Sequence, residues 1–124
     1  MTPRVLIVDD EPDIREVARM SLESVAGWQV LMAADGRAAV EIAQTERPDA
    51  LLLDVMMPDL DGPATLALIR ERSTSRDLPA LFLTAKAQAF DAGRLKELGA
   101  QGAIAKPFDP MTLHAQISSA LGWD

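Results

Sequence analysis

The chain of 124 residues contains no cysteine, no tyrosine and only one histidine. The absence of cysteine excludes a disulfide framework, a thiolate zinc site and a thiol nucleophile. The apolar run near the start, residues 5–8, is far too short for a signal peptide or a membrane span. The length suits one hydrophobic core and leaves little room for a second. We therefore expect a single cytoplasmic domain over residues 1–124.

Positive charge is also scarce. Asp and Glu number 19 against 12 Lys and Arg, which gives a net charge of −7 at pH 7. A surface that binds nucleic acid needs a basic patch, so this balance argues against direct contact with nucleic acid. We expect no nucleic-acid partner and no membrane partner.

Five short apolar runs alternate with segments of helical spacing. Several runs are apolar at consecutive positions, which is typical of strands covered on both faces. The predicted strands are residues 5–8, 28–33, 50–53, 80–84 and 103–105. The alternation predicts a parallel α/β sheet with right-handed crossovers and helices on both faces.

Five helices are predicted between and after these strands. Apolar spacing marks them within residues 14–25, 39–43, 63–70, 90–98 and 113–121. We expect Phe90, Leu95 and Leu98 of the fourth helix to face the core. Trp123 is expected to be exposed or loosely packed, and His114 to be a surface or partly packed residue of the last helix and not a phosphorelay histidine.

Polar side chains stand at the ends of four of the predicted strands. They are Asp9, Asp10 and Glu11 after the first, Asp54 after the third, Thr84 at the end of the fourth, and Lys106-Pro107 after the fifth. The carboxyl ends of parallel strands share one edge, where ligands of such folds gather. We therefore expect these side chains to meet.

Clustered carboxylates repel one another unless a proton or a cation neutralises them. Oxygen ligands without His or Cys favour a hard cation such as Mg²⁺, which leaves room for a phosphate. A carboxylate beside such a metal can act as a nucleophile and form an aspartyl phosphate. Asp54 is the predicted acceptor, with Lys106 and the Thr84 hydroxyl contacting the phosphoryl oxygens.

The stretches VLIVDDE, LLLDVMMPDLDG, LTAKA and IAKPF resemble the motifs of bacterial response-regulator receiver domains of the CheY-like type. The similarity covers essentially the whole chain. It implies a flavodoxin-like, doubly wound five-stranded parallel sheet of order 2-1-3-4-5 with five helices. It also implies a stand-alone receiver of two-component signalling that catalyses only its own phosphotransfer and dephosphorylation and is not otherwise an enzyme.

The same resemblance implies roles for single residues. Asp54 would receive the phosphoryl group from a sensor histidine kinase or a histidine phosphotransfer protein, and an unknown downstream protein would recognise the altered surface. Asp10 would bind Mg²⁺ directly and Asp9 through water, with Asp54 and the backbone carbonyl of Met56 as further ligands.

For the phosphoryl group, the resemblance implies contacts with Thr84 and Lys106, and a cis peptide bond between Lys106 and Pro107. Ala103 departs from the family, which usually has Tyr, Phe or His at this position as a switch. The signal then passes through the loop around Thr84 and the fourth helix alone, or the domain is a phosphate shuttle or sink in a phosphorelay. A receiver fragment of a longer regulator is a further alternative.

Other functions fit less well. A flavodoxin-like nucleotide or flavin module needs a Gly- or Thr-rich phosphate loop after the first strand, where this chain has DDEPD. A haloacid-dehalogenase-type hydrolase needs a second acid two residues after its nucleophile, and that position is Met56. A calcium loop aligned on Gly62 would place Met57 and Leu68 at ligand positions, so Asp59 and Asp61 are interpreted as turn residues. A degenerate receiver used only as a scaffold would normally have lost an acid or the lysine.

Overall fold

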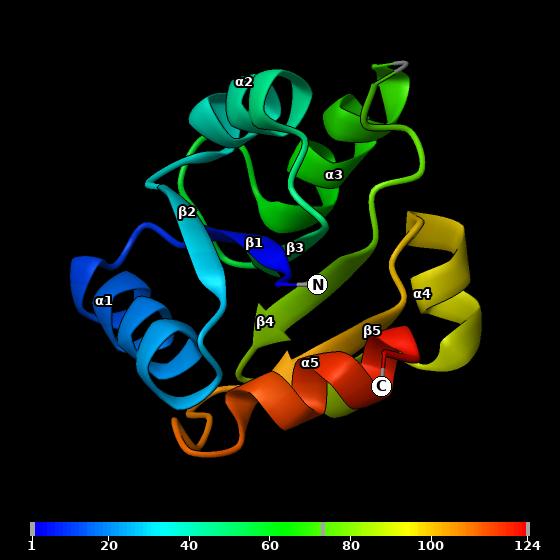
Figure 1. Cartoon of the computed structure of the whole chain (residues 1–124). Helices are drawn as coiled ribbons and strands as arrows, with labels where there is room; N and C mark the ends of the chain where they lie inside the picture. Colours follow the sequence, from blue (N-terminus) through cyan, green and yellow to red (C-terminus); the bar gives the residue numbers. More distant parts are fainter. Residues whose placement is uncertain (1, 73, 124) are drawn as a thin grey trace.

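A computed structural model describes residues 2–72 and 74–123 of the chain. Its centre is one parallel sheet of five strands in the order β2-β1-β3-β4-β5 (Figure 1). The strands are β1 (Arg4–Val8), β2 (Gln29–Ala33), β3 (Ala50–Asp54), β4 (Ala80–Thr84) and β5 (Gly102–Ala105). The predicted fold class and strand order are confirmed.

Seven helical segments connect and follow the strands in the described part of the chain. They are α1 (Pro12–Met20), the π-helical turn η1 (Ser21–Val25), α2 (Gly36–Glu46), α3 (Gly62–Glu71), the 3₁₀ turn η2 (Ala87–Ala89), α4 (Ala92–Leu98) and α5 (Leu113–Leu121). None of the helices within the described residues combines the length and the apolar character that a membrane crossing requires.

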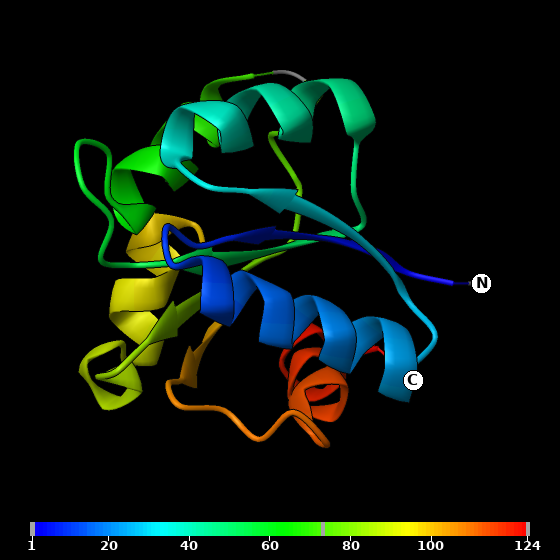
Figure 2. The same ribbon diagram turned by 90° about the vertical axis from the view of Figure 1, so that its left-hand side faces the viewer.

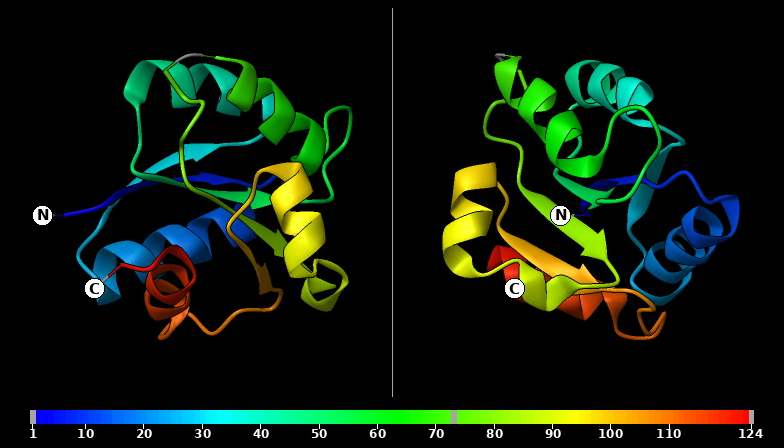
Figure 3. Two further views of the ribbon diagram at one scale, coloured as in Figure 1. Left: turned by 90° about the vertical axis from the view of Figure 1, so that its right-hand side faces the viewer. Right: turned by 180° about the vertical axis from the view of Figure 1, so that it is seen from behind.

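The sheet separates two hydrophobic cores. Helices α2 and α3 cover one face, while α1 and α5 cover the other (Figure 2). Helix α4 belongs to the first face, because Leu95 and Leu98 pack against the same core as α3 (Figure 3). Every residue of β3 and β4 is buried, as expected for central strands covered on both sides.

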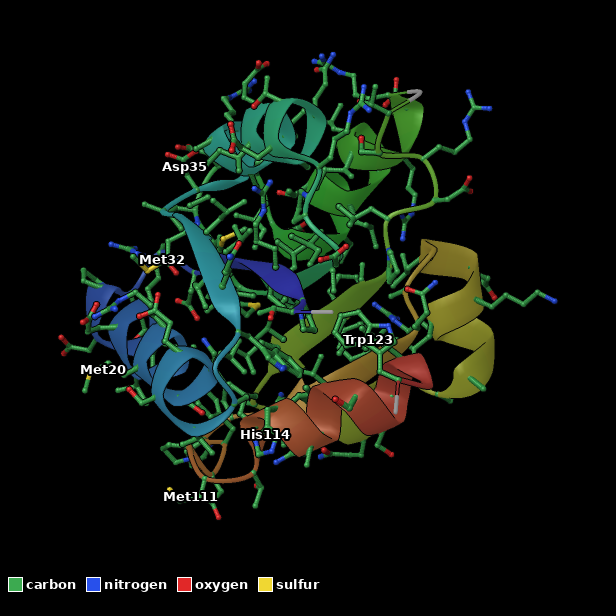
Figure 4. The ribbon with its side chains drawn as sticks, in the orientation of Figure 1. Met20, Met32, Asp35, Met111, His114 and Trp123 are labelled. Atoms are coloured by element: carbon green, nitrogen blue, oxygen red, sulfur yellow. The ribbon has the colours of Figure 1, made fainter. Side chains whose placement is uncertain are left out.

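Aspartate caps fix where three helices begin. The side chains of Asp35, Asp61 and Asp91 accept hydrogen bonds from backbone N–H groups three residues later, at 2.8 to 2.9 Å. Figure 4 labels Asp35 at the start of α2. Because Asp91 is the cap of α4, the prediction that Phe90 belongs to this helix is wrong. Phe90 directly follows the preceding turn η2 as its C-cap and packs half-buried against the core.

Trp123, predicted to be exposed or loosely packed, is only partly buried. Its ring packs at the margin of the core and lies 5.7 Å from the ring of Trp28 in an edge-on arrangement. His114 also meets Trp28 edge-on, at 6.2 Å, so the ring of Trp28 contacts both His114 and Trp123. Figure 4 labels His114 and Trp123. His114 is partly packed, as predicted.

Candidate functional site

Three carboxylates meet at the carboxyl edge of the sheet. Asp9 and Asp10 directly follow β1, and Asp54 is the last residue of the neighbouring strand β3. One carboxylate oxygen from each residue lies within 4.8 Å of the others. Asp9 and Asp54 are buried, whereas Asp10 is more accessible. The parallel register therefore brings together the acids that the sequence analysis singled out.

Lys106 enters this cluster from the end of β5. Its Nζ lies 2.9 Å from Asp9 Oδ2 and 3.1 Å from Asp54 Oδ1, and Glu11 Oε1 is 3.9 Å away. Its side chain is 17% exposed, so solvent screens these ion pairs only partly. One cation thus faces several carboxylates, and the cluster keeps a net negative charge.

The electrostatics of Asp54 follow from this imbalance. Burial, and then the nearby charge of Asp9, raise the pKa of Asp54 from its ordinary 3.8 to about 6, although Lys106 acts in the opposite direction. Burial alone lowers the pKa of Lys106. The interactions of Lys106 with the carboxylates of Asp9 and Asp54 together outweigh burial, so the pKa of Lys106 is raised overall. Asp54 is therefore mostly an anion at neutral pH, and this buried charge lowers the stability of the folded protein.

One oxygen of Asp9 has no satisfactory hydrogen bond. Asp9 Oδ1 accepts from the backbone N–H of Glu11 at 2.9 Å, and the carbonyl oxygen of Asp9 accepts from Arg15 at 2.7 Å. Asp9 Oδ2 is buried and close to Lys106, but it receives no hydrogen bond of normal geometry. A buried carboxylate oxygen in this condition, next to two further acids, fits a hard divalent cation. The donor set thus suits Mg²⁺.

Thr84 closes the site on the side of β4. It is buried, and its Oγ1 accepts a hydrogen bond from the backbone N–H of Lys86 at 3.1 Å. The backbone N–H of Lys106 donates to the carbonyl of Thr84 at 2.8 Å, which ties the ends of β4 and β5 together. The Lys106–Pro107 peptide bond is cis.

Two residues near Asp54 differ in their surroundings. The side chain of Met56 is exposed, two residues after Asp54. Gly62 instead lies directly against the end of β3, where an added Cβ would come within 2.5 Å of the carbonyl oxygen of Asp54 and 2.8 Å of Val55 Cα. Its N–H donates to the carbonyl of Val55 at 2.9 Å. The close packing of Gly62 was not predictable from the sequence, because the Asp-Gly-Pro pattern indicates only a turn before a helix.

The other acids of the loop after β3 lie outside the cluster. Asp61 caps α3, and Asp59 is exposed with a positive φ of 66°. Both act as turn residues, as predicted. His114 lies on α5 beside Trp28, away from the carboxylates.

The chain is similar to a known protein family. The family model described as response regulator receiver domain matches residues 5–118. The PhoP alkaline phosphatase synthesis transcriptional regulatory protein of Bacillus subtilis is 39% identical over 98% of this chain and 49% of its own length. The response regulator MprA of Mycolicibacterium vanbaalenii is 43% identical over 98% and 51%. The chain therefore spans about half the length of these relatives.

Solved structures agree. Chemotaxis protein CheY4 of Vibrio cholerae superimposes with a TM-score of 0.88 at 35% identity, covering 97% of this chain and 99% of its own. The receiver domain of a sensor histidine kinase from Pseudomonas aeruginosa gives 0.83 at 33% identity, covering 98% and 99%, and holds a magnesium ion in its active site cleft. On its sequence, its fold and its acidic edge, the chain belongs to the response regulator receiver domain family of two-component signalling.

Proposed function

We propose that Asp54 of this domain accepts a phosphoryl group from the phosphohistidine of a sensor histidine kinase or a histidine phosphotransfer protein. The observation that carries the proposal is the position of Asp54, buried at the end of β3 and in contact with Lys106 at 3.1 Å beside two further acids. A nucleophile fixed on a buried strand is held in one orientation, which is most of what phosphoryl transfer asks of a protein.

The transfer exchanges one phosphorus bond for another. An Oδ atom of ionised Asp54 attacks the phosphorus, and the bond between phosphorus and the histidine nitrogen breaks. The imidazole leaves with the electron pair of that bond and takes up a proton, while Asp54 carries the phosphoryl group as an acyl phosphate. Lys106 and the Thr84 hydroxyl then contact the phosphoryl oxygens. The domain acts only on its own acceptor, in transfer and in hydrolysis.

Asp9, Asp10, Asp54 and the backbone carbonyl of Met56 would hold Mg²⁺. When bound, Mg²⁺ neutralises the charge that collects on the carboxylates and the phosphoryl oxygens. The buried Asp9 Oδ2 without a hydrogen bond supports this assignment, as does the magnesium ion in the related Pseudomonas domain.

The phosphorylated surface would then be recognised by a downstream protein in the cytoplasm. Residues 1–124 would form one receiver domain. A second role, as a phosphate shuttle or sink, is favoured by one observation. Ala103 occupies the strand position where the family usually has an aromatic switch.

The test is the intact mass of the protein after incubation with Mg²⁺ and a small acyl phosphate donor. We expect one added phosphoryl group on the wild type, none without Mg²⁺ and none on Asp54→Asn. Asp59→Asn, an exposed acid of the same loop, is the matched control and should gain the group normally. An adduct that persists on Asp54→Asn would assign the acceptor elsewhere.

A further inference from the structure

β5 has Ala103 at the position where the family usually has an aromatic residue, and another segment places an aromatic ring close to it. Ala103 of β5 pairs in register with Phe82 of β4, so both side chains face the same core. Phe90, which lies between η2 and α4, packs on Phe82 with ring centroids 5.3 Å apart and planes tilted by 39°. A half-buried aromatic ring therefore lies on the residue next to Ala103, carried by the loop after β4.

This loop is connected to the phosphoryl site through hydrogen bonds. The N–H of Lys86 donates to Thr84 Oγ1 at 3.1 Å, and the carbonyl of Lys86 accepts from the N–H of Ala89 at 3.0 Å. The N–H of Phe90 donates in turn to Ala87 at 3.1 Å. A short hydrogen-bonded turn thus runs from the Thr84 hydroxyl to the Phe90 ring.

Helix α4 has no fully buried residue, so little packing opposes a shift of its start. All seven of its residues are described, and none is buried. Its start is held by the Asp91 cap and by Arg94, whose guanidinium lies 5.1 Å above the Phe90 ring. Its end is fixed, because Arg70 donates to the carbonyl of Gly99 at 2.6 Å. A displacement at Phe90 would therefore act on the start of α4, while Arg70 holds the other end.

We propose that Phe90 is the aromatic relay of this domain and takes over the role of the ring that Ala103 lacks. Turning of the Thr84 hydroxyl toward the phosphoryl group on Asp54 breaks its hydrogen bond with Lys86. The turn at η2 then moves, Phe90 changes its stacking on Phe82, and the exposed face of α4 is presented differently. This inference rests on the proposed phosphorylation of Asp54.

The chain offers a direct probe, because it has only three phenylalanines. Protein labelled with 4-fluorophenylalanine gives one ¹⁹F resonance per ring, and Phe90→Leu and Phe108→Leu assign them. With Mg²⁺ and a small acyl phosphate, we expect the Phe90 resonance to move by more than its linewidth as the phosphoryl adduct appears by mass. Asp54→Asn should show no movement.

Hydrogen exchange of residues 85–98 then tests whether Phe90 carries the change. We expect phosphorylation to alter exchange there in the wild type and in Phe108→Leu, whose ring packs on the opposite core, but not in Phe90→Leu. Both variants should form the adduct to within about twofold of the wild type, since neither ring contacts the carboxylates. Thr84→Ser should keep the response, because it keeps the hydroxyl.

The outcomes separate the two proposals. An adduct with an unchanged Phe90 resonance, or an exchange response that is the same in Phe90→Leu, would overturn the relay and leave the phosphoacceptor intact. Absence of an adduct on the wild type would overturn both.

Discussion

The ammonium group of Lys106 lies 3.1 Å from the carboxylate of Asp54, although the two residues are 52 positions apart in the chain. The pair joins the last strand of the sheet to its central strand across β4. Because Lys106 also contacts Asp9, it is the cation that keeps two buried acids side by side.

Removal of this cation should destabilise the metal-free protein. We expect Lys106→Met to lower the free energy of unfolding at pH 7 by about 3 kcal/mol, since it leaves two buried carboxylates without their partner. The measurement is urea denaturation in EDTA. Lys96→Met, on the exposed side of α4, is the matched control and should change stability by less than about 0.5 kcal/mol. Equal effects of the two substitutions would show that the buried pair contributes nothing specific.

The raised pKa of Asp54 predicts how stability depends on pH in EDTA. Between 3.8 and about 6 the folded protein binds more protons at this group than the unfolded chain does, so its contribution to stability falls as pH rises through this window. The full difference is worth about 3 kcal/mol at most. Asp54→Asn removes the charge, so it should stabilise the metal-free protein at pH 7 by about 1–3 kcal/mol and flatten the profile. Asp59→Asn should leave the profile unchanged, and a destabilised Asp54→Asn would contradict the argument.

Binding of Mg²⁺ should offset the same repulsion. A ligand that binds only the folded state adds about 2.7 kcal/mol of stability at roughly 100 times its Kd. We expect Asp10→Asn to weaken Mg²⁺ binding by about tenfold or more, as measured by calorimetry, because it removes one of three clustered ligands. Asp13→Asn, an exposed acid in the first turn of α1, should bind Mg²⁺ like the wild type. Equal Kd values for Asp10→Asn and the wild type would exclude Asp10 as a ligand.

Gly62 should be intolerant of a side chain. Gly62→Ala places a methyl group 2.5 Å from the backbone oxygen of Asp54, so β3 or α3 must move. We expect a loss of about 2 kcal/mol or more in thermal or urea unfolding, together with slower formation of the phosphoryl adduct. Gly93→Ala is the control, since its Cβ would meet only Asp91 Oδ1 at 3.5 Å within exposed α4. Alanine is the better helix former, so this variant should gain up to about 1 kcal/mol.

The strands and the site residues were both predictable from the sequence, because the central strands are buried on both faces. Strands such as β3 are buried on both faces, so they read as continuous apolar runs, and a polar residue at the end of such a run is conspicuous. Asp54 and Lys106 were found in this way, and the parallel topology then brought their ends together. The family resemblance supplied the strand order.

Other features depend on contacts that a local pattern does not show. Phe90 matched the apolar spacing of the fourth helix, but Asp91 is the N-cap and α4 begins at Ala92, two residues after Phe90. Trp123 is half-buried because it packs against the ring of Trp28, which is far away in the chain. The π-helical turn after α1 and the close packing of Gly62 are likewise settled by neighbours in space.

The arrival of Lys106 from β5 has a consequence for protein synthesis. The three acids are translated early, and β1 and β3 can pair before β5 exists. Until the last strand docks, a nascent chain would hold the carboxylates without the lysine that balances them. The site is therefore complete only when β5 has joined the sheet, because its lysine follows the last strand.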